Sequence, residues 1–182
     1  YEMTSSLVGS EMCIRDRYLP TQNDVKEVSI IPRGVAGGYT MYKSDEDKYY
    51  ISKTEMQEKL IALLGGRAAE RVALDDISTG ASNDIEVATT IAKDMIVKYG
   101  MNDFIGPISL KNENGEYELD MFGKEMGDKI GEEVKKLIDT AYNDAQIILR
   151  QHMDKLDAVA EELLANEKIN EETFKKFFEG EE

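Results

Sequence analysis

Asp84 is the residue whose type and spacing point most directly to chemistry. Its neighbours at plus four, seven and eleven are Ala88, Ile91 and Met95, which share one apolar helix face. The carboxylate is therefore expected to point toward the core, where an unpaired charge costs several kcal/mol. Two interpretations stay open. Asp84 binds a metal ion, or it accepts hydrogen bonds from free N–H groups in the first turn of a helix and complements the helix dipole.

The chain offers few other ligands for a metal. Asp75 and Asp76 could join Asp84 in a carboxylate cluster for a hard cation such as calcium, but they have the pattern of a turn and lack calcium-loop spacing. His152 is the one histidine, and without a partner we assign it no role. Cys13 is the one cysteine, which excludes an internal disulfide and a cysteine-based zinc site and favours a reducing compartment.

Short strands and a capped helix precede Asp84. The residues from Val25 to Ile31 are β-prone, and glycines separate them from a second short run at Tyr39 to Met41, which predicts a strand pair. Ser52 and Glu55 have the spacing of a capping box, so a helix is expected to begin there. Its apolar stripe runs from Met56 to Ala68, and the helix is expected to continue to Ala73.

The rest of the chain is predicted to be mostly helical. A second helix covers Ser82 to Tyr99 and stops at Gly100. Helical period returns at about Asp128 and continues to Phe178, with breaks near residues 152–154 and at Asn170.

The predicted fold class is mainly α, with a small β-hairpin or sheet. The helices around Leu60 and Ala88 are expected to pack together, and the C-terminal helices are expected to form a bundle beside them.

Several blocks of the sequence resemble one protein family. The string DISTGASND runs from Asp76 to Asp84. Further blocks in the same order are VSIIPRG at 28–34, AGGYT at 36–40, LLGGRAAE at 63–70 and KYGM at 98–101. Together they are similar to the FtsH-type metalloprotease domain, from about Tyr18 to Phe178. The resemblance implies a helical metalloprotease domain in which Asp84 is the third protein ligand of a catalytic zinc ion, Zn²⁺.

The same resemblance implies an H-E-x-x-H helix that ends just before Leu19, which places the motif near residues 8–12. Those residues read VGSEM. The motif supplies two zinc-binding histidines and a glutamate that activates the metal-bound water, so Asp84 alone cannot hold a catalytic zinc ion. We therefore predict no catalytic residue in this chain.

Residues 1–17 show no sustained periodicity, and the string SSLVGSEMCIRDR at 5–17 resembles translated sequencing-adapter read-through. We expect them to be a non-native segment and residues 18–182 to form a partial peptidase domain. A genuine divergent N-terminus is the alternative.

Two other features gain an interpretation from the resemblance. Glu70 is a candidate for orienting a zinc-bound histidine, or else a solvated helix carboxylate. Arg67 is interpreted as a partner in a structural salt bridge with Glu70 or Asp84. The strand Val28, Ser29, Ile30 and Ile31 resembles the edge strand on which zinc proteases bind extended substrates, with an ordinary core strand as the alternative.

Composition limits the possible partners. The chain has 22 basic and 37 acidic residues, a formal net charge of −15, which argues against binding to nucleic acid or anionic lipid. No run is apolar enough to cross a bilayer, and no signal peptide is predicted. No G-x-x-x-x-G-K-[ST] phosphate loop occurs, so ATP and Mg²⁺ are expected to bind only in a separate ATPase domain.

By resemblance, the parent protein is a membrane-anchored homo-hexamer whose peptidase domain faces the cytoplasm. Its expected substrates are unfolded, damaged or membrane proteins. A non-catalytic helical module for assembly or binding, derived from the same family, is the alternative. We expect the isolated chain to bind zinc weakly, to cleave nothing and to self-associate.

Overall fold

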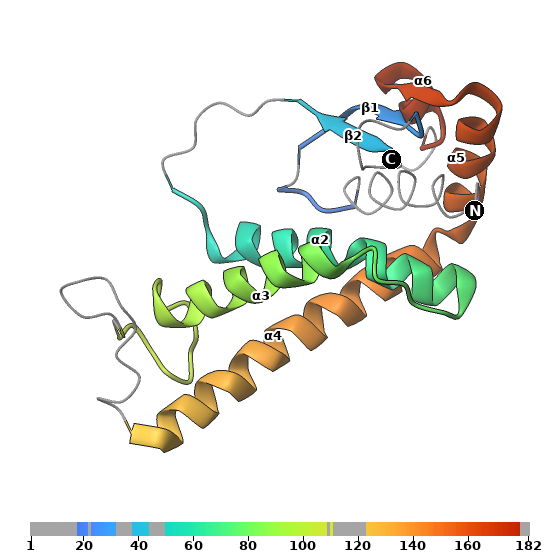
Figure 1. Ribbon diagram of the computed structural model, residues 1–182. Helices are drawn as coiled ribbons and strands as arrows, with labels where there is room; N and C mark the ends of the chain where they lie inside the picture. Colours follow the sequence, from blue (N-terminus) through green and yellow to red (C-terminus); the bar gives the residue numbers. More distant parts are fainter. Residues whose placement is uncertain are drawn as a thin grey trace.

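The computed structural model of the chain describes residues 18–21, 23–31, 38–43, 50–108, 110 and 123–178. Its elements form a layer of long helices and, beside it, a small sheet with two shorter helices (Figure 1). The prediction of a mainly α protein with a small sheet is confirmed. The predictions for residues 1–17, including the motif position at 8–12, lie outside the described residues.

Helix α2 (Lys53–Leu74) begins where the capping box predicted. The Ser52 hydroxyl accepts a hydrogen bond from the Glu55 N–H at 3.2 Å, and the Glu55 carboxylate accepts one from the Ser52 N–H at 2.7 Å. These two bonds satisfy N–H groups that the first helical turn leaves free. The start of α2 is therefore determined by residues within its own first turn.

Helix α3 (Ser82–Val97) ends close to the predicted stop. Gly100 has a φ of +60°, a left-handed conformation that only glycine adopts without strain. A Cβ atom at this position would lie 2.9 Å from the Cα of Pro107, so the following loop also needs a residue without a side chain here.

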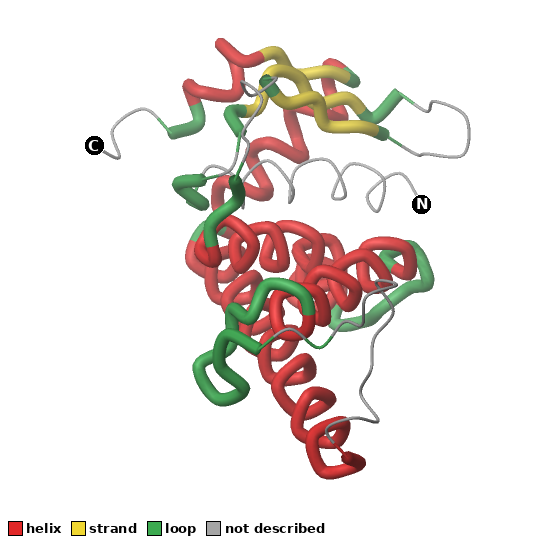
Figure 2. Tube along the Cα trace, turned by 90° about the vertical axis from the view of Figure 1, so that its left-hand side faces the viewer, coloured by secondary structure: helices red, strands yellow, loops and turns green. Residues whose placement is uncertain are grey.

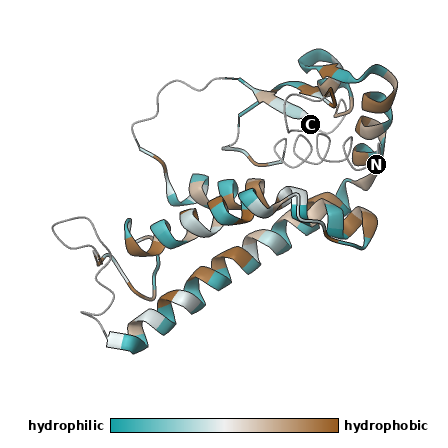
Figure 3. Ribbon diagram, viewed as in Figure 1, coloured by the Kyte–Doolittle hydropathy of each residue, from teal (hydrophilic) through white to brown (hydrophobic). Residues whose placement is uncertain are grey.

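Three helices form the first layer. Helix α4 (Gly123–Gln151) runs along both α2 and α3, and its apolar residues pack with theirs in one buried cluster. Figure 3 shows hydrophobic residues at intervals along these helices. The expected contact between the helices around Leu60 and Ala88 is confirmed, because both residues belong to one buried cluster. Farther along α2, small residues let α4 approach closely. A second buried cluster at this place consists of Ala68, Ala69, Ala145 and Leu149.

The second unit is built on a three-stranded antiparallel sheet with the order β2-β1-β3. Strand β1 (Val25–Ser29) lies between β2 (Tyr39–Tyr42) and β3 (Lys168–Asn170), as Figure 2 shows for the yellow strands above the helical layer. The strand pair β1–β2 confirms the sequence prediction, whereas β3 was missed. Its three residues are too few to show a strand period.

The C-terminal helices divide between the two units. Helix α4 joins α2 and α3, whereas α5 (Met153–Asn166) and α6 (Glu171–Lys176) pack against the sheet. The core beside the sheet consists of Val25, Val28, Leu156, Val159, Leu163, Ile169, Phe174 and Phe178. The breaks predicted near residue 152 and at Asn170 are confirmed. Within the described residues, no helix is long and apolar enough to cross a membrane.

Candidate functional site

The strongest candidate residues lie on either side of the loop between α2 and α3. Glu70, one turn before the end of α2, uses both carboxylate oxygens on a single residue of this loop. The Ser78 N–H donates to Glu70 Oε2 at 3.0 Å, and the Ser78 hydroxyl donates to Glu70 Oε1 through a short hydrogen bond. The Gly80 N–H in turn donates to Ser78 Oγ at 3.1 Å. A helix residue thus holds the loop by side-chain contacts that span eight positions in the sequence.

Arg67 balances the charge of this carboxylate. Its Nη1 lies 3.9 Å from Glu70 Oε2, and the two side chains are only 20% and 14% exposed. Nη1 is buried, and no hydrogen-bond acceptor for it lies in the described part of the chain. The salt bridge between Arg67 and Glu70 that the sequence suggested is present, at a distance that makes it an ion pair without a hydrogen bond.

Asp84 lies in the first turn of α3 and is half-buried. Its carboxylate is a suitable ligand for zinc, and the N-terminal end of a helix favours a negative charge. Ala81 is the N-cap residue of this helix, and no side chain forms a capping hydrogen bond there. The geometry of the preceding loop therefore sets where Asp84 is placed.

The described residues do not by themselves form a site with three zinc ligands. Among them, no group of three or more histidines, cysteines, aspartates or glutamates is close enough to hold a metal ion. The alternative cluster of Asp75, Asp76 and Asp84 is therefore wrong. Asp75 ends α2 in a left-handed conformation, and Asp76 accepts a hydrogen bond from the Ile77 N–H at 2.8 Å, so both are turn residues.

His152 has a packing role at the junction of α4 and α5. Its ring stacks on Tyr18, with 3.7 Å between ring centroids and an interplanar angle of 12°. Its carbonyl group accepts hydrogen bonds from the N–H groups of Lys155 and Leu156 at the start of α5. His152 therefore links Tyr18 to the start of α5.

The expected edge position of the strand Val28–Ile31 is wrong for its first two residues. β1 pairs with β2 on one side and with β3 on the other, so the backbone groups of Val28 and Ser29 already take part in the sheet. Beyond the strand, the Ile30 N–H donates to the Glu167 carbonyl oxygen at 3.1 Å, and the Ile31 N–H donates to Ser29 Oγ at 3.1 Å. An added substrate strand could not pair with Val28 and Ser29 as predicted.

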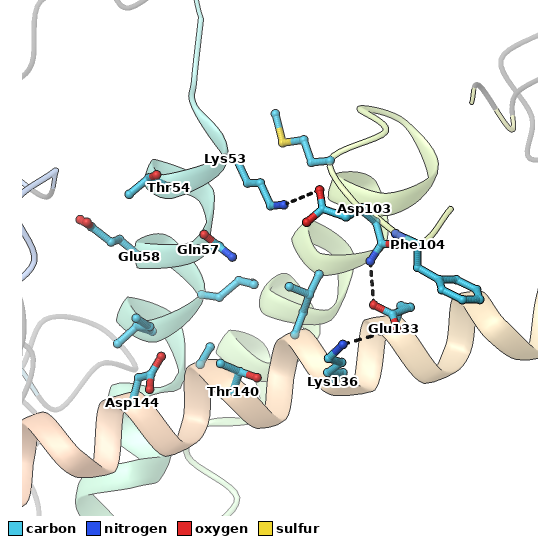
Figure 4. Close-up of a pocket in the computed structure, with 16 residues that line it drawn as sticks. Lys53, Thr54, Gln57, Glu58, Asp103, Phe104, Glu133, Lys136, Thr140 and Asp144 are labelled. Atoms are coloured by element: carbon cyan, nitrogen blue, oxygen red, sulfur yellow. Dashed lines mark hydrogen bonds and ion pairs between the residues drawn. The ribbon is translucent and has the colours of Figure 1, made fainter. Parts of the chain in front are cut away.

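A cavity of about 670 Å³ lies away from these candidates, between the first half of α2, the loop after α3 and the middle of α4. Figure 4 shows that most of its charged groups pair with one another. Lys53 lies 3.4 Å from Asp103, and Glu133 accepts from the Asn102 amide at 2.7 Å. The floor is apolar and contains Leu60, Ile61, Met101, Leu137 and Ala141. None of the candidate site residues predicted from the sequence, which are Asp84, Glu70 and the strand 28–31, lines this cavity.

Ser78 and Gly80 were missed as individual residues, although both stand in the quoted string. Helical or strand period cannot detect a hydrogen bond between a loop serine and a glutamate eight positions earlier. A Cβ atom on Gly80 would lie 3.3 Å from Ser78 Oγ and 3.9 Å from Glu70 Oε1, so the glycine leaves room for this contact.

Comparison with known proteins identifies the family of the chain. Residues 12–177 match the model of peptidase family M41. An ATP-dependent zinc metalloprotease FtsH 1 from Thermoanaerobacter sp. (strain X514) is 46% identical over 173 residues, covering 91% of this chain and 28% of that protein. FtsH from Caldicellulosiruptor bescii is 47% identical over 165 residues, covering 87% of this chain and 27% of the relative. FtsH from Thermotoga maritima is 40% identical over 171 residues, covering 90% of this chain and 28% of that protein.

The chain thus spans little more than a quarter of the length of these relatives. The family match covers both units of the fold, from before β1 to the end of α6. The chain belongs to peptidase family M41, the family of the FtsH-type zinc metalloproteases.

Proposed function

We propose that this chain is part of the proteolytic domain of a membrane-bound, ATP-dependent zinc metalloendopeptidase that degrades unfolded or damaged proteins. The observation that supports this most strongly is the family match over residues 12–177. Within the matched region, Asp84 lies in the first turn of a helix that follows a hydrogen-bonded loop. The parent reaction would be metal-assisted hydrolysis of peptide bonds.

In this proposal, Asp84 is one zinc ligand, and Glu70 acts on the loop before α3. Zinc, when bound, would supply a Lewis acid and an activated water molecule. The chain contains one histidine, whereas the H-E-x-x-H motif needs two. We therefore propose that the chain by itself is inactive and binds zinc only weakly.

The remaining functions belong to the whole protein. We propose a homo-hexamer that is anchored in a membrane, has its peptidase domain on the cytoplasmic side, and uses ATP and Mg²⁺ in a separate ATPase domain. The names of the relatives, ATP-dependent zinc metalloproteases, support the use of ATP and zinc by the whole protein.

Zinc titration of the purified chain by calorimetry tests the assignment of Asp84. We expect weak binding that becomes at least about threefold weaker in Asp84→Asn, because one charged ligand is lost. Asp94→Asn is the matched control, since it removes the same charge from the same helix at a residue paired with Lys98 at 3.8 Å. Equal binding by the wild type and Asp84→Asn would contradict the role of Asp84 as a ligand.

Zinc-dependent cleavage of casein tests the proposed inactivity of the chain. We expect no cleavage above a chelator-treated sample. Cleavage that disappears in Asp84→Asn would show that the chain is an active peptidase after all.

The presence of a single histidine favours a second candidate function, a non-catalytic module for assembly or binding. Light scattering after size-exclusion chromatography distinguishes the two. A defined oligomer without Asp84-dependent zinc binding supports the module, and Asp84-dependent zinc binding supports the peptidase domain.

A further inference from the structure

The start of α3 differs from a normal helix start in one respect. Ala81 occupies the N-cap position, and no side chain there accepts a hydrogen bond from the first turn. Serine, threonine, asparagine or aspartate usually does so, because the first N–H groups of a helix have no partner within it. Something else must fix the direction in which α3 leaves the loop.

A continuous chain of hydrogen bonds leads from α2 to this point. It begins at the Glu70 carboxylate, which accepts from both the N–H and the hydroxyl of Ser78. Ser78 Oγ then accepts from the Gly80 N–H at 3.1 Å. The Ser82 N–H donates to the Thr79 carbonyl oxygen at 3.2 Å.

The first helical hydrogen bond follows directly. The Ile85 N–H donates to the Ala81 carbonyl oxygen at 3.0 Å. Asp84 lies between Ala81 and Ile85, the two residues that this bond joins, so a shift of the loop moves its carboxylate. α2 is a rigid anchor for the loop, because Ala68 and Ala69, next to Glu70, are buried against α4.

We propose that Glu70 and Ser78 form a latch that replaces the missing cap of α3 and positions Asp84. In this view Glu70 is a positioning residue that acts through a loop serine, rather than a partner of a zinc-bound histidine. Arg67 forms an ion pair with the latch carboxylate, and Gly80 leaves the space in which the Ser78 hydroxyl lies. The importance of Asp84 rests on the proposed function, whereas the latch itself can be tested without a metal.

Amide hydrogen exchange of the full chain, resolved by NMR, tests the latch directly. Ser78→Ala removes the hydroxyl that both donates to Glu70 and accepts from Gly80. We expect exchange to become roughly tenfold faster at Gly80 and at Ile85, since hydrogen bonds to a charged group contribute most. Exchange at Ala92, in the middle of α3, should not change, which shows that the chain stays folded.

Glu70→Gln and Asp75→Asn form the matched pair. Each removes one negative charge near the end of α2. Asp75 differs from Glu70 in being exposed, and its Oδ1 lies 3.6 Å from Arg71 Nη1. Glu70→Gln should resemble Ser78→Ala, and Asp75→Asn should resemble the wild type. Faster exchange at Gly80 without any change at Ile85 would overturn the proposal, because the loop would then not control the helix start.

Zinc affinity provides a readout that a purely structural role would not move. If Asp84 binds zinc, Ser78→Ala should weaken zinc binding severalfold, and the same substitution should have no further effect in Asp84→Asn. Unchanged zinc affinity in Ser78→Ala, while Asp84→Asn loses it, would overturn the positioning role. If the wild type shows no Asp84-dependent zinc binding, the proposed function fails, and the exchange data alone decide whether the latch exists.

Discussion

The starts of α2 and α3 are fixed in opposite ways. α2 is capped by Ser52 and Glu55, which lie within its own first turn. α3 has no side-chain cap, and its start is connected through Ser78 to Glu70 on the preceding helix. A cap of the first kind depends only on neighbouring residues, whereas the second kind requires α2 to be folded first. The comparison shows that the helix with the candidate ligand is also the one that depends on its surroundings.

The largest expected loss of stability is at the C-terminal end of α3, because the conformation of a single residue fixes this end. Gly100→Ala puts a Cβ atom on a left-handed residue and 2.9 Å from the Cα of Pro107. We expect the free energy of unfolding to fall by about 2–3 kcal/mol. Urea denaturation measures this.

Gly131→Ala is the control for that substitution. Gly131 lies within α4, and a Cβ atom there would meet nothing within 4 Å. Alanine should stabilise this helix by roughly 0.5–1 kcal/mol. Similar losses in both variants would show that α3 does not depend on the conformation of Gly100.

Glu70→Ala tests the start of α3 by removing both acceptors for Ser78. It also leaves the guanidinium of Arg67, only 20% exposed, without its opposite charge. We expect a loss of about 2 kcal/mol in the free energy of unfolding. Asp75→Asn, at an exposed surface pair, should change it by less than about 0.5 kcal/mol. Equal stability of Glu70→Ala and Asp75→Asn would contradict the importance of the Glu70 contact for the start of α3.

Ser52→Ala tests the locally fixed start of α2. The hydroxyl accepts one hydrogen bond, from the Glu55 N–H, and its loss should cost about 1 kcal/mol. Because the cap is local, amide exchange should become faster in the first turn of α2 and remain unchanged at Ile85 in α3. A change at Ile85 would mean that the two helix starts are coupled.

The smallest expected effect is at the start of α6. This start combines a cap from a neighbouring residue with a contact to a residue far away in the sequence. Asn170 caps the helix by accepting from the Thr173 N–H at 2.9 Å. Hydrogen bonds from Lys175, in the same helix, and from Lys43, after β2, lower the pKa of Glu171 from 4.5 to about 2. This stabilising contribution is complete above pH 4.5 and is lost as the pH falls toward 2.

A carboxyl NMR titration of Glu171 measures the effect. Lys175→Met should raise the pKa of Glu171 more than Lys43→Met does, because the bond to Lys175 is the larger cause. High salt should reduce both effects, since the pairs are at the surface. A titration midpoint that stays the same in both variants would contradict the assigned pairs.

The sequence was sufficient for features that depend on neighbouring residues. The capping box at Ser52, the stop at Gly100 and the breaks near His152 and at Asn170 all appear in the structure. Each depends on the conformational preference or hydrogen bonding of residues a few positions apart.

Features that depend on distant residues were missed. β3 is too short to recognise without its partner β1, and that partner changes β1 from an edge strand to a central one. The candidate site divides in the same way. Asp84 became a candidate because of its helical neighbours, whereas the contact between Glu70 and Ser78 exists only once the chain folds back on itself.

The pairing of β1 with β3 has a consequence for synthesis of the protein on the ribosome. Glu27, Val28 and Ser29 pair with Asn170, Ile169 and Lys168, so one side of the central strand has no neighbour until almost the whole described chain has been made. Helices α2 and α3 form from contacts much closer in sequence and can assemble earlier. A nascent chain that pauses before Lys168 therefore exposes one side of β1 as an unpaired strand edge, which is the state most prone to wrong association.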